Sequence, residues 1–104
     1  MPHVSIADPG AAVSVQPGSV VSKVIHRDTE LTVTVFGLDA GEGLDEHRTG
    51  RVAIVQVLSG HLLLLVDGED INAGPGFWLQ MAPDTPHALR ALEPTVMLLT
   101  LLHV

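Results

Sequence analysis

The amino-acid sequence predicts a single all-β domain with the architecture of a barrel or a sandwich. Short runs rich in Val, Leu and Ile recur along the chain, and turns containing Gly or Pro separate them about every 8–12 residues. The one run that also fits a helical period, residues 61–66, is only six residues long and is bordered by glycines, so a strand is the better interpretation. We therefore expect six to eight strands and little or no helix.

The clearest strand lies at residues 30–38. Leu31, Val33 and Val35 alternate there with threonine, which is the period of two expected for a strand with one buried face. Asp67-Gly68 is a strong signal for a two-residue hairpin turn. The other expected strands are residues 20–25, 52–58, 61–66, 77–81, 87–92 and 96–104, and residues 44–49 form a short connecting segment.

Length and composition indicate one domain with a real core. The chain has 104 residues, of which 46% are hydrophobic and 16% charged, and one domain is the usual organisation at this size. Aromatic residues make up only 3%, so the core must be built from Val, Leu and Ile, of which Val and Ile favour strands. Residues 1–19 mix Pro, Gly, Ser and Ala and are expected to form an irregular lead-in. The barrel domain is placed at residues 20–104.

Charge and cysteine content exclude several classes of function. The formal net charge is -7, and there is no basic cluster or aromatic platform, so nucleic-acid binding is not expected. The chain has no cysteine, which excludes disulfides, thiolate nucleophiles and Cys-ligated zinc. No apolar run approaches the ~20 residues that span a bilayer, and the first residues do not form a signal peptide. We therefore expect a cytoplasmic protein that does not bind membranes.

Two motifs between residues 41 and 87 resemble those of the cupin family. The first begins at Gly41, reaches His47 and ends in Val57-Leu58-Ser59-Gly60. The second runs from Gly76 through a short strand and a proline-containing turn to Pro86-His87. The resemblance covers roughly residues 30–104 and implies the family's fold, a double-stranded β-helix, which is a jelly-roll-like barrel.

The same resemblance implies an incomplete set of metal ligands. In the family, the first motif carries two histidines and a glutamate, and the second motif carries a third histidine. Counting back from Gly60 places Ala53 where the family has its glutamate. His47 then takes the first histidine position and Thr49 the second. With His87, two of the four usual ligands remain.

His47 and His87 are the residues most expected to carry function. We expect them on neighbouring strands, pointing into the mouth of the barrel. Neutral imidazole suits Zn, Cu, Fe and Ni, but a tight site needs three or four protein ligands. The cofactor would therefore be a weakly bound divalent metal (Zn, Ni, Fe or Mn) or none. In the alternative interpretation, both histidines only form hydrogen bonds within a polar pocket. The alignment places Thr49 and Ala53 in that pocket. Alternation puts Phe77, Leu79 and Met81 on one face of residues 77–81 and Trp78 and Gln80 on the other, without deciding which face lines the pocket and which the dimer surface. We assign Phe77 and Met81 to the pocket.

Two functions follow from this site. The first is a small-molecule binding protein whose mostly apolar pocket has His47 and His87 as polar anchors. The second is a metal-dependent enzyme of the dioxygenase, isomerase or decarboxylase type, in which these histidines hold the metal. A structural dimer without a small-molecule role is a third alternative. Several strands are apolar on both faces, so we expect a homodimer formed through strand faces.

Overall fold

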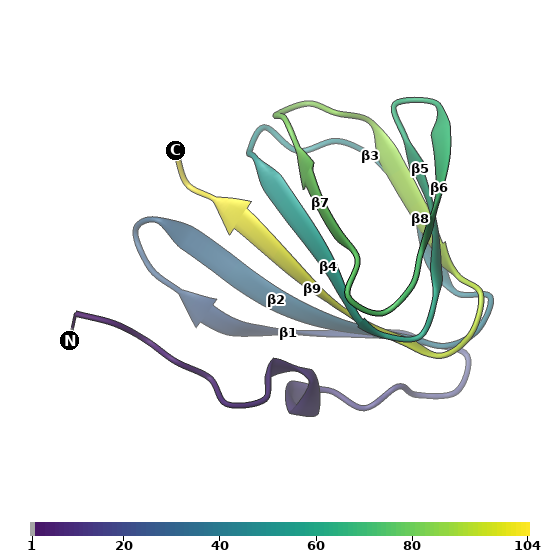
Figure 1. The fold of residues 1–104 in the computed structure, drawn as a ribbon, viewed down its shortest axis with the longest axis horizontal. Helices are drawn as coiled ribbons and strands as arrows, with labels where there is room; N and C mark the ends of the chain where they lie inside the picture. Colours follow the sequence, from purple (N-terminus) through teal and green to yellow (C-terminus); the bar gives the residue numbers. More distant parts are fainter. Residues whose placement is uncertain (1) are drawn as a thin grey trace.

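The computed structural model describes residues 2–104, which form two antiparallel β-sheets facing each other (Figure 1). The larger sheet has five strands in the order β1-β2-β9-β4-β7, and the smaller sheet has four in the order β3-β8-β5-β6. The bounds are β1 (Val20–Arg27), β2 (Leu31–Leu38), β3 (Gly43–His47), β4 (Ala53–Ser59), β5 (Leu62–Val66), β6 (Glu69–Ala73), β7 (Trp78–Met81), β8 (His87–Ala91) and β9 (Thr95–Leu102), with one 3-10 turn, η1 (Pro9–Ala12).

The core lies between the sheets and is built from aliphatic residues. Its fully buried members include Leu38, Leu62, Leu64, Val57 and Met97. On each strand these residues alternate with side chains that face outward, as the period-two pattern predicts. Burial of this apolar surface is the main contribution that stabilises the fold.

Nine strands are found in residues 2–104, one more than the upper limit of the six to eight expected. β3 was expected only as a connecting segment, and β6 was not predicted. Ile71 is the only large apolar side chain in β6, and it pairs with Leu64 on β5. The remaining residues are polar or small because β6 is an edge strand, so the strand pattern is weak there. The turn that leads into it does match the prediction: Asp67 and Gly68 have φ values of 48° and 81°, as a type I′ hairpin turn requires.

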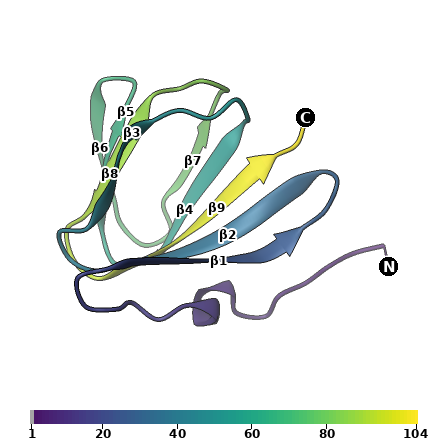
Figure 2. The same ribbon diagram turned by 180° about the vertical axis from the view of Figure 1, so that it is seen from behind.

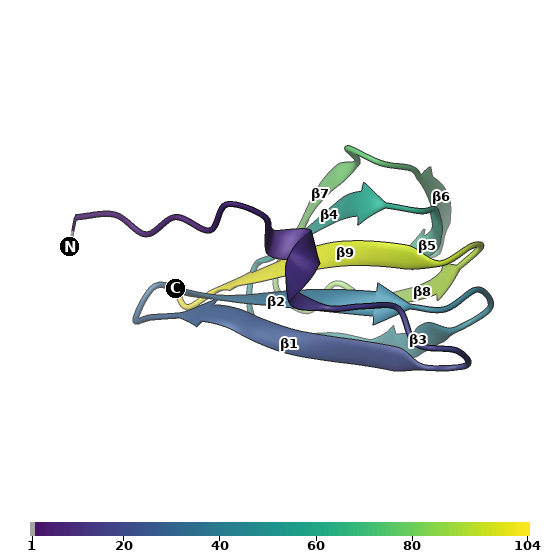
Figure 3. The ribbon, with the colours of Figure 1, turned by 90° about the horizontal axis from the view of Figure 1, so that it is seen from below.

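The N-terminal residues cover part of the outer face of the larger sheet. In Figure 3 they cross β2 and β9 with η1 at the crossing. A Cβ atom on Gly37 would lie 3.5 Å from Val13 Cγ2 and 3.5 Å from the Cα atom of Val15. On the same face Val35 is completely buried although it lies outside the core between the sheets. Residues of this chain, and not only a second copy, therefore cover the apolar outer face of β2.

At one end of the barrel, a buried threonine forms hydrogen bonds that link two segments of the chain. Thr95, at the start of β9, is fully buried. Its hydroxyl donates to the Glu93 carbonyl oxygen at 2.7 Å and accepts from the His61 backbone N–H at 3.0 Å. The turn before β9 is thereby joined to the start of β5. No helix in residues 2–104 is long and apolar enough to cross a membrane.

Candidate ligand site at the mouth of the barrel

The candidate site lies at the opposite end, where β3 leads to β4 and β7 leads to β8 (Figures 1 and 2). We call this end the mouth; its two loops are residues 48–52 and 82–86. The backbone N–H of Asp84 donates to the carbonyl oxygen of Thr49 at 2.7 Å, so the two loops are linked directly. Asp84 adopts a positive φ of 64°, a conformation that Asp tolerates in turns.

His47 and His87 lie next to each other at the mouth. His47 is the last residue of β3, His87 is the first residue of β8, and the two are directly paired across the antiparallel ladder. Their ring centroids are 4.2 Å apart and their planes are tilted by 59°. His47 is exposed, whereas His87 is 7% exposed. One imidazole therefore faces solvent at the rim and the other lies below it.

The position of His47 depends on the local pairing of β3 with β8. Gly43 pairs with Arg90 and Leu44 with Leu89, and the register then shifts before His47 pairs with His87. A shift of this kind is a β-bulge, which redirects a side chain near a functional site. Gly43 is required because a Cβ atom there would overlap the Leu89 carbonyl oxygen.

Hydrogen bonds determine which nitrogen of each imidazole is available to a ligand. His47 Nδ1 lies 2.8 Å from the Asp45 carbonyl oxygen, and His87 Nδ1 lies 2.9 Å from the Thr85 carbonyl oxygen. A carbonyl oxygen only accepts, so both Nδ1 atoms carry the proton, and the lone pair of each neutral ring is on Nε2. Within residues 2–104 neither Nε2 atom has a hydrogen-bond partner, and neither is a buried unsatisfied atom.

The two rings border a small apolar cavity inside the barrel. Its volume is about 20 Å³, which is room for about one water-sized molecule. Nine of its eleven lining residues are apolar, and the other two are the histidines. The lining consists of Leu44, His47, Val55, Leu64, Val66, Leu79, Met81, His87, Leu89, Met97 and Leu99.

The structure brings together three of the six pocket residues expected from the sequence: His47, Met81 and His87 line this cavity. Ala53 is buried beside Met81 and Leu101, but its methyl group is not part of the lining. Phe77 packs against the deeper core, and Thr49 lies in a mouth loop. Leu64, Val66 and Leu89 also line the cavity, although the sequence did not indicate them. β5 is apolar at every position, so its sequence does not show which of its side chains face inward.

The residues present do not fit the divalent metal site of the cupin family. Within residues 2–104 no group of three or more His, Cys, Asp or Glu side chains is placed to hold a metal ion. Asp45 and Glu46, the acids next to His47, line a groove on the outer face of the smaller sheet, with Leu63 and Leu65. They therefore do not replace the missing metal ligands. Ala53, at the position of the family's glutamate, has no ligand atom.

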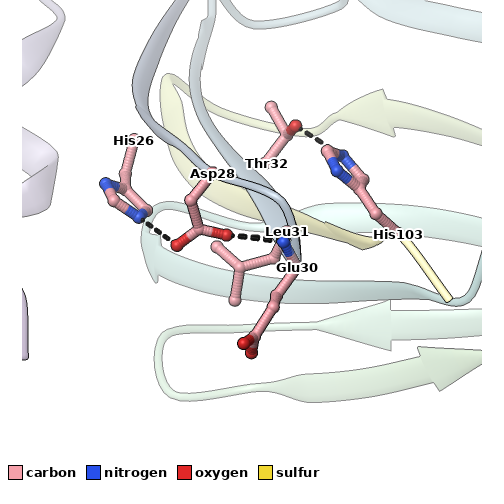
Figure 4. A network of polar contacts seen from close by, with 6 residues as sticks. All are labelled: His26, Asp28, Glu30, Leu31, Thr32 and His103. Carbon is pink, nitrogen blue, oxygen red and sulfur yellow. Dashed lines mark hydrogen bonds and ion pairs between the residues drawn. The ribbon is translucent and has the colours of Figure 1, made fainter. Parts of the chain in front are cut away.

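A separate network of polar contacts lies at the β1–β2 turn (Figure 4). His26 Nε2 is 2.8 Å from an Asp28 carboxylate oxygen, and the other carboxylate oxygen accepts from the backbone N–H groups of Glu30 and Leu31 at 2.7 and 3.0 Å. The His26 hydrogen bond, followed by these backbone bonds, lowers the pKa of Asp28 from 3.8 to about 2. This network closes a turn, and it lies on the larger sheet, away from the histidine pair.

The C-terminal histidine is also held by a hydrogen bond. Thr32 Oγ1 and His103 Nε2 are 2.8 Å apart, and the backbone N–H of His103 donates to the Glu30 carbonyl oxygen at 2.7 Å (Figure 4). These contacts fix the end of β9 against the start of β2.

Many solved structures are similar to this fold, and three of them are described here. A conserved protein of unknown function from Streptococcus pyogenes is 29% identical, with a TM-score of 0.86, over 100% of this chain and 91% of that chain. An RmlC-like cupin from Desulfovibrio desulfuricans is 25% identical, with a TM-score of 0.85, over 97% and 98% of the two chains. A cupin 2 conserved barrel domain protein from Leptotrichia buccalis is 32% identical, with a TM-score of 0.81, over 88% of this chain and 45% of that chain.

No family model matches the sequence, and no curated protein matches it. The strand topology and the solved structures nevertheless agree on the class: the chain is a small cupin-like domain. The predicted fold, an all-β cupin barrel with little helix, is confirmed.

Proposed function

We propose that this protein binds a small molecule at the mouth of its barrel, with His47 and His87 as the polar anchors. The observation that supports this most directly is the adjacent pair of imidazoles, which belong to residues that line an apolar cavity and whose Nε2 atoms have no hydrogen-bond partner within residues 2–104. Binding sites of this kind combine apolar walls with a few convergent polar groups.

The geometry limits the chemistry of the ligand. The cavity of about 20 Å³ is far smaller than the ~300–1,000 Å³ typical of sites that enclose a drug-sized ligand. The body of the ligand would therefore lie over the mouth, and only a small polar group would reach the rings. A neutral Nε2 atom accepts a hydrogen bond, whereas a protonated ring donates one. The class that suits both states is a small apolar molecule carrying a hydroxyl or carboxyl group.

The second candidate function is a metal-dependent enzyme of the dioxygenase, isomerase or decarboxylase type. Its support is that both Nε2 lone pairs are free at neighbouring positions, as metal ligation requires. Thr49 and Ala53 count against it, because neither replaces the missing histidine and glutamate with a comparable ligand. A divalent metal held by two imidazoles and water would bind only weakly.

Fragment binding followed by two-dimensional NMR tests the first candidate. Phenol, benzoate and a short hydroxy acid are titrated into ¹⁵N-labelled protein. We expect shifts confined to His47, His87 and the residues that line the cavity. His47→Ala should abolish them, and because His47 is exposed this variant should fold normally. His3→Ala, which replaces an exposed histidine near the N-terminus, is the matched control. Absence of any such shift, or shifts that survive His47→Ala unchanged, would overturn the proposal.

Metal analysis of protein purified without a nickel column separates the two candidates. About one equivalent of Fe, Mn, Zn or Ni that disappears in the His47→Ala/His87→Ala variant would favour the enzyme. Metal-free protein that still binds the fragments would favour the binding protein.

We also propose a homodimer formed through the part of the larger sheet's outer face that the N-terminal residues do not cover. Trp78 on β7 is 55% exposed there. Trp78 pairs with Gln56, which pairs in turn with Leu98 on β9. Leu98 lies in a groove that the N-terminal residues also line, so the uncovered part is centred on Trp78. Aromatic residues are enriched at protein interfaces.

A further inference from the structure

A groove lies between the N-terminal residues and the outer face of the larger sheet. Its volume is about 590 Å³, which is within the ~300–1,000 Å³ of sites that hold small molecules. One wall comes from the residues before η1, which in Figure 3 extend toward the same end as the β1–β2 turn. The other wall comes from β1, β2, the turn between them and β9. No residue lines both this groove and the cavity beneath His47 and His87, so the two are separate.

Apolar side chains line both walls of the groove but do not fill it. On the N-terminal wall, Val4 is 64% exposed and Ile6 is 41% exposed. On the sheet, Leu31, Val33 and Leu98 are only partly buried. Eight of the twelve lining residues are apolar. A molecule that removes these facing apolar surfaces from water would be bound favourably, and an exposed apolar surface of this kind is typical of a binding site.

A β-bulge positions the polar end of the groove. The register of β1 against β2 shifts between Val24 and His26. Both Ile25 and His26 line the groove, whereas neighbouring residues of a regular strand would face opposite sides. Bulges redirect side chains in this way next to functional sites. His26 Nε2 lies 2.8 Å from a carboxylate oxygen of Asp28, which also lines the groove (Figure 4).

This polar end is negatively charged and accepts hydrogen bonds. Asp28 and Glu30 are among the lining residues, and no Lys or Arg of residues 2–104 is. The hydrogen bond from His26 and two from backbone N–H groups lower the pKa of Asp28 to about 2, so its carboxylate is ionised at neutral pH. An ionised carboxylate only accepts, so His26 Nε2 donates to it, and the lone pair of the neutral ring is on Nδ1. A complementary ligand is therefore a hydrogen-bond donor with positive charge.

We propose that this groove binds a small apolar amine, with its ammonium group at the His26–Asp28 pair and its apolar body between the N-terminal wall and the sheet. An ionised carboxylate has about four acceptor positions. His26 and the backbone N–H groups of Glu30 and Leu31 occupy three of those on Asp28, at 2.8, 2.7 and 3.0 Å, so one remains. These bonds also hold the carboxylate in place before a ligand arrives, which reduces the ordering cost of binding.

Two probes of nearly the same size and shape test the charge complementarity. Phenethylammonium and the neutral phenethyl alcohol are titrated separately into ¹⁵N-labelled protein at neutral pH. We expect the amine to shift the backbone signals of Ile25, Val33 and Leu98. It should bind at least about threefold tighter than the alcohol, which is the size of effect expected for a charge pair at a partly exposed site.

Asp28→Asn should remove this preference, so that the two probes bind about equally. The ratio of the two affinities is the readout, because a change in the shape of the turn alone would weaken both probes alike. Asp70→Asn is the matched control: it removes the same charge from β6, at a residue that does not line the groove, and it should leave the ratio unaltered. Ile6→Ser, at an exposed residue before the first strand, should weaken both probes.

Three results would each overturn the proposal: an amine that does not shift the groove residues, equal binding of the two probes to the wild-type protein, or a preference for the amine that survives Asp28→Asn. Amine-induced shifts at His47 and His87 in place of the groove residues would overturn it as well. The proposal does not depend on the function proposed for the mouth, because the two sites share no lining residue and are probed with molecules of different charge.

Discussion

At the scale of single residues, the site is defined by which ring nitrogen each histidine presents. His47 and His87 both donate Nδ1–H to the backbone carbonyl two residues earlier, at Asp45 and Thr85. This arrangement fixes ring orientation and tautomer together, and it uses no second side chain. The sequence therefore contains no residue pattern from which the tautomer could have been predicted, although the two histidines themselves could be.

We expect the titration of Asp28 to change the free energy of unfolding. Its pKa is lowered to about 2 by the hydrogen bonds from His26, Glu30 and Leu31. A lowered pKa means that the ionised carboxylate stabilises the folded state, so the contribution is complete above about pH 4 and is lost as the pH falls through 2. We expect the NMR titration of the Asp28 carboxyl to have its midpoint near 2.

Urea unfolding between pH 4 and pH 2 gives the matching thermodynamic test. Asp28→Asn should reduce the pH dependence of the free energy of unfolding in this interval. Asp70→Asn, which changes an exposed acid on β6, should leave that dependence unaltered. A midpoint of the Asp28 titration near 4 would contradict the network drawn in Figure 4.

At the scale of elements, the strands that could be predicted are short apolar runs bounded by turn residues, and β2 also shows clear alternation. β2, β4 and β5 were found close to their expected bounds, and the Asp67-Gly68 turn between β5 and β6 has the backbone that its sequence requires. β6 was missed because it is an edge strand with one large apolar side chain. β3, expected only as a connecting segment, is a strand because its backbone pairs with β8.

Alternation also explains which pocket residues could be predicted. It places Phe77, Leu79 and Met81 on one face of β7, but it does not show that this face is the inner one, and it does not give their depth in the barrel. Phe77 lies deeper than Met81 and packs against the core, so only Met81 is level with the histidines. Ala53 has the correct side and depth, but its side chain is too short to take part in the lining.

The pairing of β3 with β8 depends on Gly43. A Cβ atom there would overlap the Leu89 carbonyl oxygen and lie 3.0 Å from the Arg90 Cα atom, so Gly43→Ala must push β3 away from β8. We expect a loss of about 1–3 kcal/mol in the free energy of unfolding, as for other substitutions that overfill a packed site. The measurement is chemical unfolding, with NMR contacts between His47 and His87 recorded on the same variant.

Gly50→Ala is the matched control for this prediction. Gly50 lies in a mouth loop, has no positive φ, and a Cβ atom there would meet nothing within 4 Å. The control should change the free energy of unfolding by no more than about 0.5 kcal/mol. Equal effects of the two variants would show that the close approach of β3 to β8 does not determine the site.

At the scale of the whole molecule, the outer face of the larger sheet divides into a covered and an uncovered part. The residues before β1 cross β1, β2 and β9 (Figure 3), with Val13 and Val15 next to Gly37 on β2. β7 lies beyond this cover, whereas Leu58 at the end of β4 lies next to Gly10 of η1. The sequence predicted that an apolar outer face needs a cover, but it could not distinguish a second copy from the chain's own N-terminal residues, since the lead-in has no regular pattern.

We propose that the homodimer interface lies on the uncovered part of this face. Trp78 is the only tryptophan of the chain and is 55% exposed, so its fluorescence reports directly on this face. On association its emission maximum should move to shorter wavelength as the protein concentration rises, and light scattering should give the mass of a dimer at micromolar concentration.

Trp78→Lys places a charge in the face and should give a monomer with an unchanged far-ultraviolet circular dichroism spectrum. Leu92→Lys, at a 51% exposed residue in the β8–β9 turn, should leave the dimer intact. A monomeric wild-type protein at micromolar concentration, or a dimer that persists in Trp78→Lys, would exclude this interface.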